Sequence, residues 1–538
     1  MKPSPAQRAP RRRSIGLACT LFALGSASST RAETLAEAIA LAYRENPTLE
    51  VSRYDLRATD ETYAQARAEL RPTARIDVTG NYDKTVPGRT TQAARSPFEQ
   101  LNSSIITSNR LGAQAIVDQP IYTGGRATAD IAAASASVRA GRQALRGSEG
   151  DLLAQVITAY VDIRRDERIV DIRKQDVANL TATLAEVKAR REAGELTRTD
   201  TAQAQAQLEI SRALLASSMA DLETSRANYA AVVGRNPGLL AAEPPLPQLP
   251  RTVDDAYDIA EQGNPELAQA RYAELSSRAQ IVAARSATRP TLSLEGTAGL
   301  SGRADPFYLH NEDQAFTGVA VLTVPLYAGG RSRSLIAQAG DRNVSDRLRI
   351  EAARRDVVLR VREAWNGVVT TRRNIIIQTA QVEAARVQTE GMFEEYRVGL
   401  RSTFDVIYAQ QTLRDARISL LASQHDLYVQ EATLLRRLGL LEARALMVGV
   451  ALYDPAQNFR HAARREALPW DGAFRALDRV VEPGSHQHVI DEPSIAPGAP
   501  NIVATRHVGP GDALATRSPV TPIPGTVGRP VPTAKPYR

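Results

Sequence analysis

The sequence has one cysteine, few aromatic residues and no long apolar run. Cys19 is the only cysteine among 538 residues, so removal of the N-terminal stretch that holds it would exclude disulfides, cysteine metal sites and cysteine nucleophiles. Aromatic residues make up 5% and the mean hydropathy is -0.28, which favours an elongated protein over large globular cores. No run of about 20 apolar residues is present, which excludes a helical membrane span and leaves a β-barrel as the route across a bilayer.

Motifs of catalysis and nucleic-acid binding are also missing. The net charge is +7, but arginine is spread along the chain beside Glu and Asp without an aromatic-basic platform, which is typical of solvated helices. There is no Gly-rich phosphate loop, His-Glu-x-x-His or nucleophile elbow, and the neighbouring His486 and His488 have no third ligand in view. The sequence therefore predicts no enzyme activity, no cofactor, no metal site and no nucleic-acid partner.

The N-terminus has the pattern of an export signal. Three arginines, 11–13, precede an apolar stretch over 15–27, and Thr30-Arg31-Ala32 carries small residues at the two positions that a signal peptidase reads. The sequence predicts a signal peptide over 1–32. A lipid anchor on Cys19 is disfavoured because Gly16 stands where a leucine-type residue is expected.

An internal repeat organises most of the remaining chain, and its two copies span 33–235 and 252–440. Asn46-Pro47 and Arg71-Pro72 recur as Asn264-Pro265 and Arg289-Pro290, and Gly194 with Asp200 recurs as Gly399 with Asp405. The turn Gly124-Gly125-Arg126 recurs as Gly329-Gly330-Arg331. Between the copies, the Pro-rich segment 236–251 predicts a stiff linker.

Each copy predicts a helix, two strands and a long helical hairpin. The strands over 75–83 and 291–298 alternate polar and apolar residues, and the returning strands are expected over about 110–120 and 315–326, ending at Pro120 and Pro325. Such runs of about 10 residues can cross a bilayer when tilted. The alternation predicts one apolar face, formed by Ile76, Val78, Leu292 and Leu294.

The segments 125–191 and 330–397 contain no proline, and as helices each would reach roughly 100 Å. Apolar residues recur at intervals of seven along these segments and along the returning helices, as in Val361, Val368, Ile375 and Val382. Sevenfold spacing keeps an apolar seam on a partner helix only when the pair supercoils. The sequence therefore predicts coiled-coil hairpins, with turns at the repeated glycines.

Together these features resemble the TolC family of outer-membrane efflux and secretion ducts. The doubled Asn-Pro, Arg-Pro and Tyr-x-Gly-Gly-Arg motifs and the closing Leu452-Tyr453-Asp454-Pro455 carry the resemblance, which extends to about residue 460. It implies a mixed α and β membrane protein, a homotrimer whose four strands per subunit form a twelve-stranded barrel continued by a helical periplasmic tunnel. Four strands with two open edges cannot surround a pore alone, which independently requires oligomerisation.

The resemblance places a closed aperture at the hairpin turns. In the family, the residues that match Tyr396 and Arg401 hold the inner hairpin against an aspartate of the outer hairpin. That aspartate corresponds to Asp200, which lies beside Thr199. We therefore expect these four residues to form a latch.

The resemblance also implies an acidic ring at the aperture, formed by Asp405. Many relatives carry a second aspartate three residues later, where this chain has Tyr408, so we expect a thinner acidic constriction. An alternative role for Asp200 and Asp405 is helix N-capping, because each lies near the start of a helix where a carboxylate meets free backbone N–H groups. Both roles stay open for these two aspartates.

Function follows from the resemblance as an expectation. It implies an exit duct in the outer-membrane lipid that passively exports substrates delivered by a periplasmic adaptor (membrane fusion protein) and an inner-membrane transporter of ABC or RND type. Type I protein secretion and small-molecule efflux both fit. The alternative is a periplasmic coiled-coil adaptor without a pore, against which the four amphipathic strands argue.

The C-terminal region, 441–538, is expected to hold an equatorial segment followed by a tail. Eleven of the thirty prolines lie from Pro483 onward, and no apolar period is visible from about residue 456. The composition predicts a disordered tail, and deletion of residues 470–538 is expected to leave trimer assembly and pore conductance intact.

Overall fold

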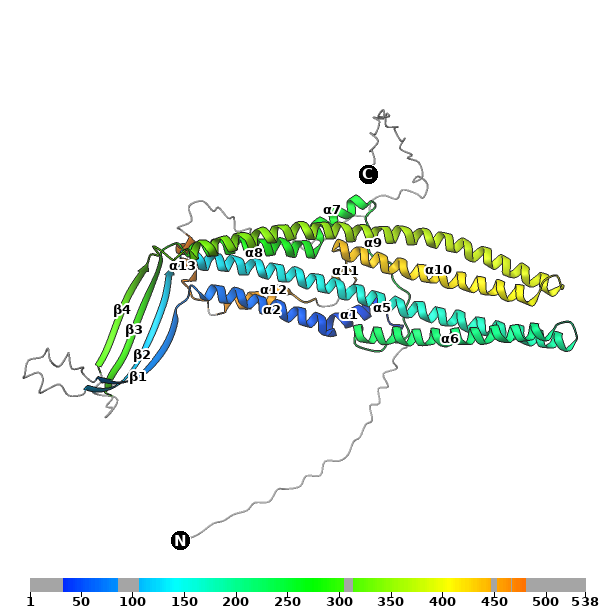
Figure 1. Cartoon of the computed structure of the whole chain (residues 1–538), viewed down its shortest axis with the longest axis horizontal. Helices are drawn as coiled ribbons and strands as arrows, with labels where there is room; N and C mark the ends of the chain where they lie inside the picture. The colour runs from blue at the N-terminus through cyan, green and yellow to red at the C-terminus, as the bar shows by residue number, and fades with distance from the viewer. Residues whose placement is uncertain (1–31, 86–105, 304–312, 447–451, 466, 480–538) are drawn as a thin grey trace, which may run out of the picture. The chain divides into compact units, whose positions relative to one another are not determined.

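A computed structural model describes residues 32–85, 106–303, 313–446, 452–465 and 467–479 (Figure 1). The predicted signal peptide, apart from Ala32, and the histidines at 486 and 488 lie outside the described residues. The first half contains α1 (Leu35–Glu45), α2 (Pro47–Ala68), β1 (Thr73–Thr85), β2 (Ile106–Tyr122), α5 (Arg126–Glu192) and α6 (Arg198–Val233). The second contains α7 (Val253–Gly263), α8 (Pro265–Ser286), β3 (Thr291–Arg303), β4 (Asp313–Thr323), α9 (Arg331–Arg397) and α10 (Thr403–Leu438). The element order of the first half thus recurs in the second.

The repeated motifs make the same local contacts in both halves. Asn46 and Asn264 each cap a helix whose first residue is proline, a position that needs no backbone N–H. Each also reaches the end of a returning helix, because Asn46 Nδ2 donates to the Val232 carbonyl at 3.0 Å and Asn264 Nδ2 to the Arg437 carbonyl at 2.9 Å. The sequence repeat is therefore a repeat of contacts as well as of elements.

The strands form one antiparallel sheet in the order β1-β2-β3-β4. Paired residues of an antiparallel ladder lie on the same face, so the register assigns each side chain to a face. One face is polar, with Asp77 opposite Gln114 and Asp118 opposite Glu295. The other face is apolar and carries Ile76, Val78, Tyr82, Leu111, Ala113, Ala115, Val117, Leu292, Leu294, Ala298, Leu300, Phe316, Ala320 and Leu322.

The apolar face of the sheet is open to solvent in the single chain. The side chains of Ile76 and Phe316 are 75% and 82% exposed. The register confirms that Ile76, Val78, Leu292 and Leu294 share a face, as the alternation predicts. Among the described helices, none is long and apolar enough to cross a membrane.

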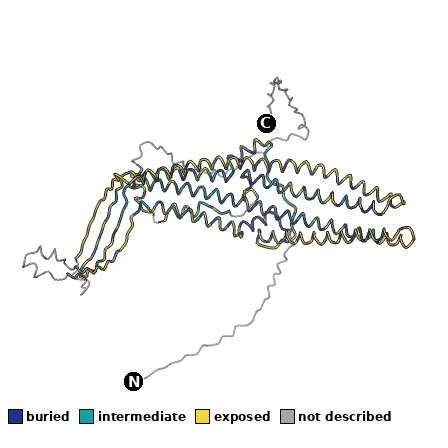
Figure 2. The backbone as a smooth tube through the Cα atoms, in the orientation of Figure 1, coloured by how far each residue is buried: buried dark blue, intermediate teal, exposed yellow. Residues whose placement is uncertain are grey.

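The long helices run from the sheet to the hairpin turns at the far end, as Figure 1 shows. The predicted spans agree with α5 and α9 within a residue or two at each end. Buried residues concentrate where the helices pack, and the sheet and the hairpin tips are largely exposed (Figure 2). One extensive apolar cluster joins α1, α5, α6 and α10 and includes Tyr160, whose hydroxyl lies 2.9 Å from the Glu33 carbonyl oxygen and 2.8 Å from that of Ala241 and can donate to either.

The structure corrects two expectations, one about where two strands end and one about the C-terminal region. Pro120 does not end its strand, because β2 continues to Tyr122. The pairing register with β3 shifts between Pro120 and Tyr122, which accommodates the proline within the strand. The returning strand β4 ends at Thr323, so Pro325 lies outside it.

The second correction concerns the C-terminal region. Besides the short α11 (Ala443–Leu446), the described residues include α12 (Pro455–Arg464) and α13 (Asp471–Arg479), so the expectation of disorder from residue 456 is wrong for this segment. Arg67 of α2 and Arg71, which lies between α2 and β1, both donate to the Asp471 carboxylate at 3.1 Å. Ion pairs between residues about 400 positions apart leave no periodic signal in the local sequence.

Candidate functional site

The candidate aperture lies at the two hairpin turns. Gly194 and Gly399 adopt positive φ values of 83° and 81°, which the reversal of the chain requires and which glycine adopts without strain. Thr197 and Ser402 then cap α6 and α10. The helix macrodipole adds a partial positive charge at both starts, which favours acidic side chains there.

Asp200 and Asp405 complete these caps. The Asp405 carboxylate accepts hydrogen bonds from Ser402 N at 3.0 Å and Ser402 Oγ at 2.8 Å, and Asp200 accepts from Thr197 N at 2.9 Å and Thr197 Oγ1 at 2.8 Å. The capping interpretation is therefore confirmed for both. The hydrogen bonds lower the pKa of Asp405, from the Ser402 side chain first and its backbone second, and those from the Thr197 backbone and side chain lower the pKa of Asp200. Capping therefore keeps these carboxylates ionised.

The predicted latch residues have other partners within the chain. Arg401 Nε donates to Glu395 Oε2 at 2.6 Å, and this pair is exposed. Tyr396 is only 3% exposed, and the Arg190 guanidinium lies 4.9 Å from its ring centroid. Since Arg190 belongs to α5, Tyr396 does contact the outer hairpin, although through a cation–π contact near the end of α5. Thr199 is exposed.

Tyr408 is paired with a second aromatic residue. Its ring stacks on Phe404, with the centroids 6.3 Å apart and the planes inclined by 19°, and both side chains are exposed. Sequence reasoning missed Phe404, although its position four residues before Tyr408 places both on one helix face. It also missed Glu395 and Arg190, whose contacts depend on the helix packing.

The two strand-to-helix turns differ in how they are packed. All four glycines have positive φ, but a Cβ added at Gly124 would lie 3.0 Å from Arg289 Cβ, whereas one added at Gly329 or Gly330 meets no atom within 4 Å. Arg126 pairs with Glu69 at 2.6 Å, and Arg331 is exposed. The first turn is therefore enclosed by its own chain, and the second is open.

Asp478 of α13 caps the first turn from outside. Its carboxylate accepts hydrogen bonds from Thr123 N and Thr128 Oγ1, both at 2.8 Å, and from Gly125 N at 3.3 Å, and Asp478 is 1% exposed. The free backbone N–H groups at the start of α5 thus find their acceptor about 350 residues away. Sequence reasoning missed this residue because nothing in its local pattern marks it.

The described residues contain no group of three or more His, Cys, Asp and Glu side chains that could hold a metal ion. The turns of the two hairpins carry charged and aromatic side chains, among them Arg401, Glu395, Phe404 and Tyr408.

Comparisons with known proteins agree with this architecture. The family model described as "Outer membrane efflux protein" matches residues 38–235 and 256–440. The outer membrane efflux protein BepC of Brucella suis biovar 1 is 29% identical over 428 residues, covering 80% of this chain and 90% of BepC. The outer membrane protein TolC of Escherichia coli K12 is 25% identical over 439 residues, covering 79% of this chain and 85% of TolC.

A solved structure matches the fold. The CmeC outer membrane channel of Campylobacter jejuni superposes with a TM-score of 0.67 at 14% identity, covering 86% of this chain and 99% of CmeC. Because the family model spans both structural halves, the chain belongs to the outer membrane efflux protein family and is an outer-membrane exit duct.

Proposed function

We propose that three copies of this chain close into one duct, with twelve strands forming a barrel in the outer membrane and the helical hairpins forming a tunnel through the periplasm. The observation that carries this proposal is the sheet, whose exposed apolar face suits lipid and whose polar face suits a water-filled lumen. In the described sheet, β1 and β4 each have one neighbour only. Open edges are costly in lipid, and pairing β4 of one copy with β1 of the next removes them.

The duct is passive and takes its substrates from other proteins. The sequence has no nucleotide-binding loop, so the energy for transport comes from an inner-membrane transporter of ABC or RND type, reached through a periplasmic adaptor. Two relatives illustrate the range of systems: the alkaline protease secretion protein AprF of Pseudomonas aeruginosa, 23% identical, and the cobalt-zinc-cadmium resistance protein CzcC of Cupriavidus metallidurans, 25% identical. Substrate choice in this chain's system lies with the adaptor and transporter.

The hairpin tips form the aperture of this duct. Three copies of Asp405 would place three ionised carboxylates around the threefold axis, with the exposed ring of Tyr408 one turn further along α10. In the closed state Tyr396 and Arg401 hold the inner hairpin to the outer one near Asp200 and Thr199. Arg401 can exchange its exposed partner Glu395 for such a contact at little cost, because exposed ion pairs contribute little stability.

The test is to purify the protein from outer membranes and examine it in a planar bilayer. A heat-resistant oligomer that conducts ions, and that boiling in detergent converts to single chains, supports the duct. A soluble periplasmic protein that does not conduct would refute it and favour the alternative, a pore-less adaptor. Cross-linking in cells followed by co-purification then identifies the adaptor and transporter.

A further inference from the structure

The helix α13 is held in a fixed orientation by two buried carboxylates. Asp471 and Asp478 are 9% and 1% exposed, and they accept hydrogen bonds from the Arg71 guanidinium and from the backbone N–H of Thr123. A helix of nine residues draws its stability from such tertiary contacts. Because about two helical turns separate the two carboxylates, they fix the rotation of α13 about its own axis.

This helix lies where the strands end and the long helices begin (Figure 1). It packs on β2 and on α5, and Thr123, which Asp478 binds, directly follows β2. In the proposed barrel, the 13 residues of β1 at a tilt of 45° rise roughly 30 Å, which is the thickness of the hydrocarbon core. The helix-side ends of the strands therefore fall at the periplasmic boundary of the membrane, and α13 lies at this level.

One side of α13 is apolar and exposed. Trp470, which directly precedes the helix, and Leu477 within it are 49% and 45% exposed, and Ala473 between them is exposed as well. The spacing of these three residues, i, i+3 and i+7, places them on one side of the helix. Since the aspartates fix the rotation, this apolar side cannot turn inward to the protein.

The opposite side of α13 is basic. At 100° per residue, Arg475 and Arg479 lie about 140° and 180° around the helix from Trp470. Arg475 Nε donates to the Asp471 carbonyl at 3.3 Å, and among the described residues neither guanidinium has a carboxylate partner. Both aspartates of the helix are buried, so its exposed charge is positive.

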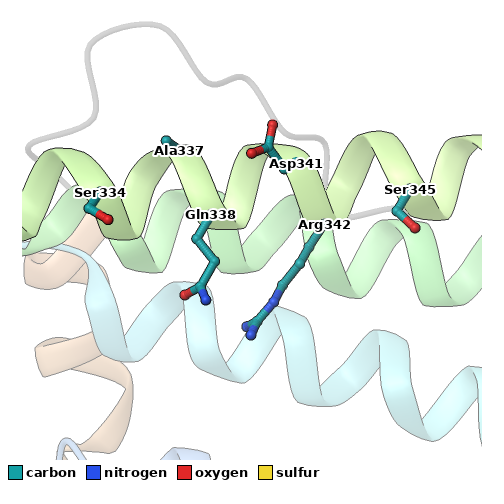
Figure 3. Close-up of a pocket in the computed structure, with 6 residues that line it drawn as sticks. All are labelled: Ser334, Ala337, Gln338, Asp341, Arg342 and Ser345. Carbon is teal, nitrogen blue, oxygen red and sulfur yellow. The ribbon is translucent and has the colours of Figure 1, made fainter.

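A surface depression near the start of α9 is polar instead. Its lining residues are Ser334, Ala337, Gln338, Asp341, Arg342 and Ser345, and Gln338 and Arg342 leave the same side of the helix (Figure 3). Such a lining is typical of solvated helix surface. The exposed tryptophan and leucine of α13, together with its unpaired arginines, are not, and this combination indicates a surface that is covered by a partner with both apolar and anionic parts.

We propose that α13 lies in the headgroup layer on the periplasmic side of the outer membrane, with Trp470 and Leu477 in contact with phospholipid. This inference rests on the proposed barrel and adds a second membrane contact to it. A helix with an apolar side and an opposite basic side is typical of helices that lie in a membrane interface. Tryptophan is enriched at this depth because its ring is apolar and its N–H is polar.

Phospholipid fits both sides of this helix. Its acyl chains cover Trp470 and Leu477, and its phosphate oxygens are acceptors for Arg475 and Arg479, whose long side chains extend along the headgroups. On the lumen side, the same helix would leave the apolar residues in water and narrow the passage. Three copies of α13 around the barrel would fix the depth at which the duct sits in the membrane.

The test uses the two tryptophans of the chain, Trp365 and Trp470. In the Trp365→Phe variant, the full-length protein in vesicles of phosphatidylethanolamine and phosphatidylglycerol reports on Trp470 alone. Lipids brominated near the headgroup end of their acyl chains should quench its fluorescence more than lipids brominated at the chain ends, because an interfacial helix is buried only about 5–10 Å deep. Acrylamide in the water should quench it weakly.

Two further variants are matched controls. Trp470→Phe leaves only Trp365, which lies about 50 Å along α9 from the start of this helix, so neither brominated lipid should quench it. Arg479→Trp, in a background with both native tryptophans replaced by phenylalanine, places the reporter on the opposite side of α13. Its fluorescence should be quenched less by lipid and more by acrylamide than that of Trp470.

The outcomes separate this inference from the duct on which it rests. Stronger quenching of Trp470 by the lipid brominated near the headgroup supports the inference. A conducting oligomer whose Trp470 is quenched by acrylamide and not by lipid overturns it, and quenching by neither overturns it in favour of a protein cover; the duct stands in both cases. Equal lipid quenching on the two sides of α13 overturns the proposed orientation. A protein that neither inserts nor conducts overturns the inference and the duct together.

Discussion

At the scale of single residues, the starts of α5, α6 and α10 depend on carboxylates that accept hydrogen bonds from backbone N–H groups. Asp405 and Asp200 cap helices from within their own turns, whereas Asp478 caps α5 from a distant segment. The first kind is visible in the sequence as a Ser/Thr followed by an acidic residue three positions later. The second kind is set by tertiary packing.

Replacement of Asp478 should destabilise the fold. Asp478→Ala leaves the buried N–H groups of Thr123 and Gly125 without their acceptor, and a buried donor left unpaired costs about 1 to 3 kcal/mol. Circular dichroism in detergent should show a lower midpoint for thermal loss of helix. Leu477→Ala, an exposed neighbour on the same helix, is the control and should leave the midpoint unchanged; an equal shift would show that Asp478 has no special role.

Asp405 allows charge and capping to be separated. Asp405→Asn retains an acceptor for the Ser402 N–H but removes the charge, so α10 should remain folded while the cation selectivity of the pore falls. The reversal potential under a salt gradient measures this change. The wild-type selectivity should survive acidification through about pH 3.9, the ordinary carboxyl pKa, because the Ser402 hydrogen bonds lower the pKa of Asp405.

The equivalent residue of the other hairpin is the matched control for this experiment. Asp200→Asn removes a charge from the same position of the same capping motif, but on the outer hairpin, where it should change selectivity less. If the two variants changed the reversal potential equally, Asp405 would not be the charge that faces the pore.

At the scale of elements, the sequence predicts those helices and strands that a periodic residue pattern or the internal repeat encodes. The positions of α5, α9 and the strands follow from the absence of proline, the spacing of sevens and the alternation of polar and apolar residues. The α12–α13 segment could not be predicted in this way, because helices of 10 and 9 residues draw their stability from contacts with partners such as Arg67 and Arg71. The position of Pro120 inside β2, and not at its end, could not be predicted either, because it depends on a shift in the pairing register with β3.

The two faces of β1 should tolerate charge differently. Ile76→Lys places a charge on the apolar face, which costs about 2 to 4 kcal/mol near the bilayer midplane, whereas Asp77→Lys keeps the polar face polar. The amount of folded oligomer in outer membranes should fall for the first variant only. Adjacent positions on one strand make these two variants a matched pair, and equal tolerance would rule out the barrel.

Truncations should show which part of the C-terminal region the stability of the oligomer requires. A stop after residue 479 keeps every described contact of α12 and α13, so assembly and conductance should match those of the full chain. A stop after residue 469 removes Asp471 and Asp478 together. Arg67 and Arg71 then lose their carboxylate partner and keep only the carbonyls of Ala463 and Arg465, and the start of α5 loses its acceptor. Its oligomer should dissociate at a lower temperature, and indistinguishable oligomers would show that these contacts contribute nothing measurable.

At the scale of the whole molecule, the proposed duct has its membrane strands and its proposed gate at opposite ends of the same helices. Each long helix has 67 residues. A helix of that size spans roughly 100 Å, so the hairpin turns are far from the strands. Changes at the tip should therefore alter conductance without altering the stability of the membrane end. The charged and aromatic side chains of the hairpin turns can be varied independently of assembly, which makes the following experiment interpretable.

Loosening the tip should open the duct. Tyr396→Phe with Arg401→Ser removes the hydroxyl and the guanidinium assigned to the latch while leaving the Tyr396 ring under Arg190, so the single-channel conductance in a planar bilayer should rise. The dissociation temperature of the oligomer should not change.

A third substitution tests whether Arg401 acts across the hairpins or within its own. Glu395→Gln removes the acidic partner that Arg401 has in the single chain but leaves Arg401 free to reach the outer hairpin, so this variant should conduct like the wild type. If Glu395→Gln raised conductance as much as the double variant, the Arg401–Glu395 pair would itself be holding the aperture closed. If neither variant changed conductance while the oligomer stayed intact, the latch would lie away from Tyr396 and Arg401.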